Sequence, residues 1–197
     1  MLVLRWVEPS STAFMRAFSE ESGEIANYDW TDYSRISENV KRAVIAAEDT
    51  RFMDHAGFDW HAIKNAASRN VREGRISAGG STITQQLAKN LFFSGDKTFV
   101  RKLNESVVAA MLECFLSKKR IFELYLNVIE WGQGIYGVNQ AARHYFDLPP
   151  SRLNPEQAAR LASYIPAPRV FYFRGDTVKS LGKTNDIRGR MSQSRFP

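Results

Sequence analysis

The stretch SENVKRAVIAAEDTRFMDHAGFDW, residues 37–60, indicates the fold class of the whole chain. Ser37 is a suitable N-cap. Apolar residues then recur at the 3.6-residue spacing of one helical face: Val40, Ala43, Val44 and Ala47. Asp59 can cap a second helix over residues 60–73, which Gly74 would end. The pattern therefore predicts two helices joined by a turn that begins with two adjacent carboxylates.

Helical patterns continue along most of the remaining chain. The further helices we expect are a short one capped by Ser81, residues 98–116, residues 117–130, residues 138–145, and one capped by Asn154 with Pro155 first and Gln157 closing a capping box. Residues 1–36 read as an irregular arm with exposed aromatic side chains: Trp6, Phe14, Phe18, Tyr28, Trp30 and Tyr33. Residues 169–197 read as a loose, polar tail. We predict a mostly α-helical protein without a large sheet.

The composition is that of a globular protein with an anionic partner. Of 197 residues, 44% are hydrophobic and 24% charged, which argues against wholesale disorder and suits one substantial domain. The net charge of +6 favours nucleic acid, a phosphorylated metabolite or an acidic membrane, without choosing among them. The single cysteine, Cys114, excludes an intrachain disulfide, and its apolar neighbours predict a buried structural thiol. No segment reaches the roughly 20 apolar residues of a spanning helix.

Glu48 is the strongest candidate for acid–base chemistry. On its predicted helix it lies beside Val44 and Ile45, and this apolar flank would raise its pKa toward the range of a general base or acid. The alternative is a helix-end carboxylate that pairs with Arg51 or Lys41.

Residues after Glu48 extend this candidate site. Asp49 reads as support for Glu48, and His55 as a hydrogen-bonded turn histidine, with a ligand or proton-shuttle role as the alternative. The stretch GGSTITQQLAKN then gathers hydroxyls, amides and an ammonium: Ser81, Thr82, Thr84, Gln85, Gln86, Lys89 and Asn90. Free amide groups at this helix start could hold a phosphate, although a capped, solvent-facing helix is the simpler account. The GxxxxGK[ST] spacing of a Walker loop is absent.

The stretch KTFVRKLNE, residues 97–105, carries a second carboxylate. Arg101 and Glu105 are four residues apart, so a surface ion pair is the simple interpretation. However, Glu105 shares its helical face with apolar residues, and the opposite face is also apolar: Leu103, Val107, Ala110 and Cys114. Because a helix that is apolar on both sides is typically buried, we expect a central helix from which Glu105 emerges into a cleft.

Taken together, these residues suggest glycosyl transfer with a phosphate leaving group. One glutamate would deprotonate the acceptor hydroxyl, and a series of cations would stabilise the departing pyrophosphate: Lys89, Lys97, Arg101 and Lys102. Metal chemistry is less supported, because the three histidines form no HxxxH or HExxH spacing and there is no cysteine cluster. We therefore predict no metal site.

Four stretches in order, EDTRFMDHAGFDW, GGSTITQQLAKN, RKLNE and KKRIFELYLN, resemble the successive motifs of the peptidoglycan glycosyltransferase family (glycosyltransferase 51 type). The resemblance covers about residues 38–168, has a weaker echo in RWVEPSSTAFM, and is closest to the monofunctional biosynthetic members. It implies a mostly α, lysozyme-like fold with a larger head and a small membrane-facing jaw around a cleft. The corresponding division is an N-terminal arm (1–36), a catalytic domain (37–168) and a polar tail (169–197).

The resemblance also implies roles for individual residues. Glu48 looks like the base that activates the acceptor 4-hydroxyl, and Glu105 like a second essential carboxylate beside Arg101 and Lys102, which would contact pyrophosphate. Lys97 stands where the family often has Arg, and Lys keeps the charge without the bidentate fork. The YLN of residues 125–127 would buttress the cleft. The other residues implied in substrate binding are Asp49, Phe52, His55, Gly80, Ser81, Thr82, Gln85, Gln86, Lys89 and Asn90.

The implied reaction polymerises lipid II into peptidoglycan strands by inverting β-1,4 transfer, with undecaprenyl pyrophosphate leaving. It requires no cofactor, although a divalent cation (Mg²⁺ or Mn²⁺) could assist at the pyrophosphate. Expected partners are lipid II, the growing strand, the membrane surface and other cell-wall synthesis proteins, with no nucleic acid. The expected location is the outer face of the bacterial cytoplasmic membrane, although the family's usual N-terminal anchor is not visible here. The alternatives are a lysozyme-like lytic transglycosylase, which would not need the cations, and a basic nucleic-acid-binding module.

Overall fold

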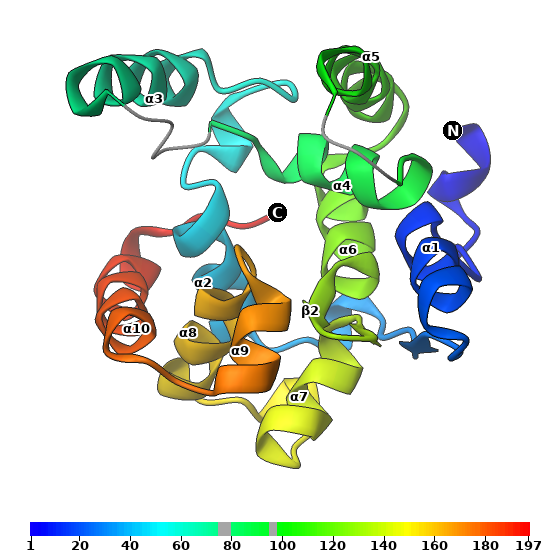
Figure 1. Cartoon of the computed structure of the whole chain (residues 1–197), viewed down its shortest axis with the longest axis vertical. Helices are drawn as coiled ribbons and strands as arrows, with labels where there is room; N and C mark the ends of the chain where they lie inside the picture. Colours follow the sequence, from blue (N-terminus) through cyan, green and yellow to red (C-terminus); the bar gives the residue numbers. More distant parts are fainter. Residues whose placement is uncertain (75–79, 95–97) are drawn as a thin grey trace.

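The structure, a computed structural model, describes residues 1–74, 80–94 and 98–197 and is built mostly from helices (Figure 1). The α-helices are α1 (Ala13–Ser22), α2 (Glu38–Glu48), α3 (Trp60–Glu73), α4 (Ile83–Phe92), α5 (Phe99–Phe115), α6 (Lys118–Val128), α7 (Val138–Phe146), α8 (Pro155–Tyr164), α9 (Pro168–Arg174) and α10 (Val178–Arg190). Short 3₁₀ turns are η1 (Leu2–Arg5), η2 (Tyr33–Arg35), η3 (Phe52–Asp54), η4 (Pro150–Arg152) and η5 (Met191–Gln193). The prediction of a mostly α, lysozyme-like fold is confirmed.

Most of the predicted helix boundaries are confirmed. They could be predicted because a local cap sets each of them. The hydroxyl of Ser37 accepts from the backbone N–H of Val40, and the Asp59 carboxylate caps α3. Asn154 and Gln157 form the expected reciprocal capping box at the start of α8. The cap of α4 differs by one residue from the prediction, because Thr82 and not Ser81 forms the capping box with Gln85.

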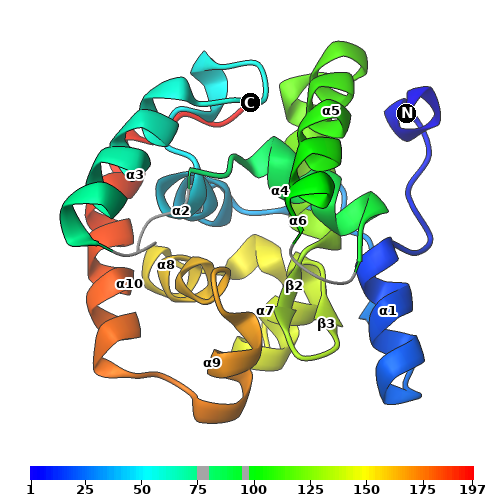
Figure 2. The same ribbon diagram turned by 45° about the horizontal axis from the view of Figure 1, so that its top comes forward.

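The helices pack in two groups around one hydrophobic core. Helix α2 packs against α8 and α10, while α4 packs against α5 and α6 (Figures 1 and 2). Seven of the eleven residues of α6 are buried, and Phe122 on this helix meets the fully buried Phe52 of η3 with ring centroids 5.7 Å apart. Because Phe52 follows directly on the carboxylate turn after α2, this contact ties the turn to the core.

A small sheet closes one side of the core. Its strands β1 (Asn27–Tyr28), β2 (Glu130–Gly132) and β3 (Ile135–Tyr136) lie in the order β1-β3-β2, with β1 parallel and β2 antiparallel to β3. Asn127 joins the end of α6 to the segment that follows β1. The Asn127 side chain accepts from the Thr31 N–H and donates to the Thr31 carbonyl. Gly137 follows β3 with φ +81°, and a Cβ there would lie 2.6 Å from the Asn127 carbonyl oxygen, so a side chain has no room.

The two end segments are more ordered than the sequence pattern predicts. The arm contains α1, whose Met15 and Phe18 are buried in the core, and of the six aromatics expected to be exposed only Trp6 is. The tail is not loose, because α10 packs against α8 and α2 and buries Ile187. The physical reason is that a few apolar residues suffice to dock a helix against a complementary face. The average composition of such a segment is still polar, so it does not indicate the docking. The division at residues 36 and 168 stays a prediction.

Helix α5 was predicted to be central and buried, and this prediction is wrong. One face holds the buried Ala109 and Leu112, but Leu103 and Val107 on the opposite face are more than half exposed. Cys114, on the same face, is exposed, so the prediction of a buried thiol is wrong. The helix therefore presents an apolar stripe at the surface of the chain: Phe99, Val100, Leu103, Val107 and Met111.

The docking of α10 can be tested by mutation. Ile187→Ala should lower the free energy of unfolding by about 2–4 kcal/mol, because it opens a cavity at a fully buried site. Leu181→Ala on the same helix should change it by no more than about 0.5 kcal/mol, because this side chain is half exposed. Urea denaturation of both variants measures the difference. Equal, small effects would mean that α10 is not part of the cooperative fold.

Candidate active site

Glu48 lies at the last turn of α2, where it meets α4. Its Oε2 accepts a hydrogen bond of 2.8 Å from Nε2 of Gln86. Tyr125 of α6 donates in turn to Oε1 of Gln86 at 2.9 Å. Two successive hydrogen bonds thus link the Glu48 carboxylate of α2 to α4 and, through Gln86, to α6. The sequence had placed this carboxylate only beside Val44 and Ile45.

The environment of Glu48 raises its pKa above the ordinary value. Burial is the largest cause, and the negative charge of Asp49 adds to it. The hydrogen bond from Gln86 and the positive charges of Lys183 and Lys89 act in the opposite direction without cancelling the effect of burial. A carboxylate with a raised pKa is suited to accept a proton from a substrate hydroxyl.

Asp49 fixes the position of α4 relative to Glu48. Its carboxylate lies 3.0 Å and 3.1 Å from Nε2 of His55, and its Oδ2 also accepts the backbone N–H of Ile83 at 3.0 Å. Ile83 is the first residue of α4, and an anion near a helix N-terminus is favourable because the first N–H groups have no partner within the helix. Asp49 is thus buried, the side chain of His55 is mostly covered, and both are engaged with the protein itself.

A second cluster lies at the start of α5. The buried carboxylate of Glu105 forms ion pairs with Arg101 (Nη1 to Oε1, 2.9 Å) and Lys102 (Nζ to Oε2, 3.3 Å). Lys102 also donates to the hydroxyl of Ser81 at 3.0 Å, just before α4 begins. Both oxygens of Glu105 therefore face cations, and the ammonium of Lys102 reaches the surface beside Ser81.

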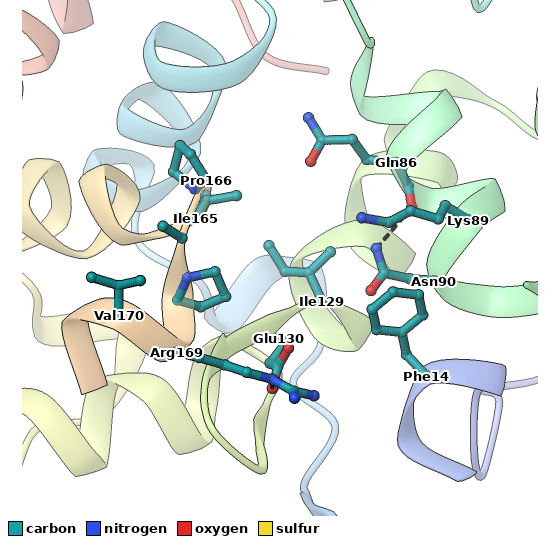
Figure 3. Close-up of a pocket in the computed structure, with 12 residues that line it drawn as sticks. Phe14, Gln86, Lys89, Asn90, Ile129, Glu130, Ile165, Pro166, Arg169 and Val170 are labelled. Carbon is teal, nitrogen blue, oxygen red and sulfur yellow. Dashed lines mark hydrogen bonds and ion pairs between the residues drawn. The ribbon is translucent and has the colours of Figure 1, made fainter. Parts of the chain in front are cut away.

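Two hollows flank α4. A hollow of about 580 Å³ runs from Gln86 past Lys89 and Asn90 to the ion pair of Glu130 with Arg169, which measures 2.9 Å (Figure 3). Across from Lys89 and Asn90, apolar side chains of the α8–α9 region form the opposite wall: Ile165, Pro166 and Val170. On the other side of α4, a hollow of about 360 Å³ includes Ser81, Gln85 and Lys102. Polar groups and apolar walls in this combination are typical of ligand sites.

The family model of the transglycosylases matches residues 15–192. The chain belongs to the transglycosylase family. Curated relatives named biosynthetic peptidoglycan transglycosylase include those of Methylobacillus flagellatus, 50% identical over all of this chain and 89% of the relative, and Laribacter hongkongensis, 47% identical over 98% of this chain and 87% of the relative. A relative of the same name from Alcanivorax borkumensis is 47% identical over all of this chain and 80% of its own.

Not all predicted binding residues of this transglycosylase line an open surface. Phe52 is fully buried in the core and lines no open surface here, so its role in substrate binding stays a prediction. Thr82 and Gln85 form the capping box of α4, and Thr82 is buried and also donates to the Gly57 carbonyl at 2.7 Å. Gln85 is mostly buried but borders the hollow of about 360 Å³. Asp49 and His55 bond to each other and to the start of α4 instead of lining a hollow. The other predicted residues of the described chain lie at the two hollows or the cluster around Glu105: Gly80, Ser81, Gln86, Lys89, Asn90, Arg101 and Lys102. Lys97 lies outside the described residues.

The site also contains residues that the sequence reading missed. Lys183 of α10 and Arg169 of α9 both come from the segment that was read as a loose tail. Nothing in their local sequence signals a site, because they reach it only through the packing of α8, α9 and α10. Nothing in the sequence pointed to Glu130 as a site residue except its position shortly after the YLN motif.

The described part of the chain offers no candidate for a metal cluster or a membrane-spanning helix. Within residues 1–74, 80–94 and 98–197, no group of three or more His, Cys, Asp or Glu side chains is arranged to hold a metal ion. In the same residues, no helix combines the length and apolar character needed to cross a bilayer.

The raised pKa of Glu48 predicts a stability effect. In the unfolded chain the carboxylate ionises near 4.5, whereas the folded protein holds its proton to higher pH, so stability falls as pH rises through this window. Glu48→Gln should therefore raise the Tm at pH 7, and the gain should vanish near pH 4, where both states are protonated. Glu38→Gln, an exposed carboxylate on the same helix, is the matched control. Calorimetry that shows Glu48→Gln less stable at pH 7 would contradict the dominance of burial.

Proposed function

We propose that the chain polymerises the glycan strands of peptidoglycan from lipid II, with Glu48 as the general base. The observation that carries the proposal is the Glu48 carboxylate, whose pKa burial raises and whose Oε2 is held by Gln86, next to a hollow of about 580 Å³. The relatives' name, biosynthetic peptidoglycan transglycosylase, supplies the substrate class. The finer substrate, lipid II, comes from the resemblance of the motifs.

In the proposed reaction, Glu48 takes the proton of the 4-hydroxyl of an acceptor N-acetylglucosamine. The oxygen attacks C1 of the N-acetylmuramic acid that ends the growing strand, from the face opposite the leaving group, so the anomeric centre inverts. The C1–O bond to pyrophosphate breaks, and its electron pair leaves with undecaprenyl pyrophosphate. A base whose pKa is raised toward the working pH favours this proton transfer.

The cluster at the start of α5 is suited to the leaving group. Arg101 and Lys102 bring two positive charges against the single carboxylate of Glu105, which leaves a net positive charge beside Ser81. Cations placed where charge develops stabilise a departing pyrophosphate. On this reading Glu105 positions the cations rather than the acceptor. We assign no step to a divalent cation, because both oxygens of Glu105 are already paired with side chains.

The cation cluster also separates this proposal from glycan cleavage. A lytic enzyme with a similar fold needs a catalytic carboxylate but has no diphosphate to stabilise, so Arg101 and Lys102 would have no task in it. A nucleic-acid-binding module would have no use for a carboxylate with a raised pKa in its cleft. The polymerising reaction uses both clusters.

The key test of the proposal is polymerisation of labelled lipid II, followed by gel electrophoresis of the product. Glu48→Gln keeps the size of the side chain and removes its basicity, so the rate should fall by about 10²–10⁴-fold. Binding of lipid II should persist, because the fold and the cations are unchanged. Glu38→Gln should polymerise at the wild-type rate. Near wild-type turnover by Glu48→Gln would rule out its role as the base.

We further propose that α5 contacts the bacterial cytoplasmic membrane from its outer face, where a lipid-linked substrate would reside. The support is the stripe of Phe99, Val100, Leu103, Val107 and Met111, whose exposed fractions run from 40% to 85%. Apolar patches on a surface that also carries cations suit an anionic interface, where each Lys or Arg contributes about 1 kcal/mol. The aromatic side chains of the N-terminal arm offer less apolar surface, because most of them are buried or partly buried.

Flotation with liposomes tests this contact. The double variant Leu103→Asp and Val107→Asp should lose most of its binding to anionic vesicles, because charged side chains cannot enter the interface. Val178→Asp changes a still more exposed valine on α10 and should leave binding unchanged. Raising the salt concentration should weaken wild-type binding without abolishing it, since only the electrostatic part is screened. Equal binding by both variants would exclude α5 as the contact.

A further inference from the structure

Tyr125 makes a contact that the proposed reaction does not use. It lies fully buried on α6, and its hydroxyl donates to Oε1 of Gln86 at 2.9 Å. The other end of the same amide, Nε2 of Gln86, donates to Oε2 of Glu48 at 2.8 Å. The three side chains form a chain of hydrogen bonds that runs from the core of the protein to the candidate base.

We propose that Tyr125 is a positioning residue, which orients the Gln86 amide so that its N–H and not its carbonyl faces Glu48. The inference rests on the proposed role of Glu48 as general base. It assigns to Tyr125 an action on the chemistry through Gln86, in addition to the packing that its burial provides.

The orientation follows from the donors and acceptors of an amide. A glutamine side chain has an acceptor at one end and donors at the other, and a carboxylate accepts only. The reverse orientation would place the Gln86 carbonyl against the Glu48 carboxylate, which is repulsive. Burial raises the pKa of Tyr125 well above its ordinary value, so the phenol keeps its proton, and in the reverse orientation the Gln86 amide nitrogen would offer that proton no acceptor.

The two ends of this chain of bonds are held firmly. Gln86 lies in the first turns of α4, and its backbone carbonyl accepts from Nδ2 of Asn90 at 2.8 Å. Tyr125 is enclosed in α6 between other buried residues of the core. Only the side-chain torsions of Gln86 are left to be set, and the Tyr125 hydroxyl sets them. Among the described residues, the bond from Gln86 is the hydrogen bond that reaches the Glu48 carboxylate.

The consequence is an effect on the protonation of Glu48. The bond from Gln86 lowers the pKa of Glu48, as do the positive charges of Lys183 on α10 and Lys89 on α4. Burial and the charge of Asp49 raise it. Without the Tyr125 hydroxyl the amide is free to turn, the bond to the carboxylate weakens, and the pKa of Glu48 rises further. The base would then stay protonated at a pH at which the wild-type enzyme works.

Tyr125→Phe removes the hydroxyl and keeps the ring, so it tests orientation separately from packing. We expect the acid limb of the pH profile of kcat/KM to move to higher pH by about one unit. At acidic pH this shift lowers kcat/KM about tenfold, and at higher pH kcat/KM recovers to the wild-type value. Tyr145→Phe is the control, because it removes another hydroxyl bond, to the Trp131 carbonyl, remote from Glu48. A loss by the same factor at every pH would overturn the proposal and leave Tyr125 a packing role only.

A double-mutant cycle and a direct titration complete the test. Gln86→Met removes both hydrogen-bonding ends of the amide at similar volume, and in that background Tyr125→Phe should cause no further shift, since it acts only through Gln86. An additional shift would overturn the proposed route. NMR titration of the Glu48 carboxyl carbon, assigned by its loss in Glu48→Gln, should show the same rise in pKa in Tyr125→Phe without any turnover. An unchanged titration overturns the inference, whereas an active Glu48→Gln enzyme overturns the proposed function alone.

Discussion

The hydrogen bond from the backbone N–H of Ile83 to the Asp49 carboxylate is the contact on which the geometry of the site depends. It joins the residue after α2 to the first residue of α4, with an anion placed at a helix N-terminus. His55 holds the same carboxylate from the other side, so Asp49 has little freedom to move. Because Glu48 immediately precedes Asp49 and Gln86 lies one turn into α4, this contact also fixes the bond between Glu48 and Gln86.

Helix α4 then connects two regions of opposite electrostatic character. Toward α2 and α6 it meets a carboxylate that burial makes reluctant to ionise, and toward α5 it meets the excess positive charge of Arg101 and Lys102. A proton acceptor and a cation cluster on either side of one helix suit a reaction in which a hydroxyl loses a proton while an anionic group departs. The separation matters, because a cation bonded directly to Glu48 would lower its pKa and weaken it as a base.

The sequence predicted the features that depend on neighbouring residues and missed those that depend on packing. Ser37, Asp59 and Asn154 could be recognised as caps because a cap bonds within three residues of itself. The site residues Lys183 and Arg169 could not, because they reach the site only through the fold of α9 and α10 against the core. Their segment is polar on average, and only sparse residues such as Ile187 show that it docks.

The wrong prediction for α5 has a different cause. The rule that a helix apolar on both sides is buried assumes that water is the only surrounding, so it would not hold for a helix that meets a bilayer, as α5 is proposed to do. Arg101 and Glu105 occupy the inner face of α5, whereas Leu103 and Val107 stand on the outer face with more than half of their surface exposed. One helix thus holds the cations proposed to bind a pyrophosphate and, a few residues along, the stripe proposed to meet a bilayer. A substrate with a charged diphosphate joined directly to a lipid chain would need these two surfaces close together, and the two faces of this one helix supply that spacing with no further element.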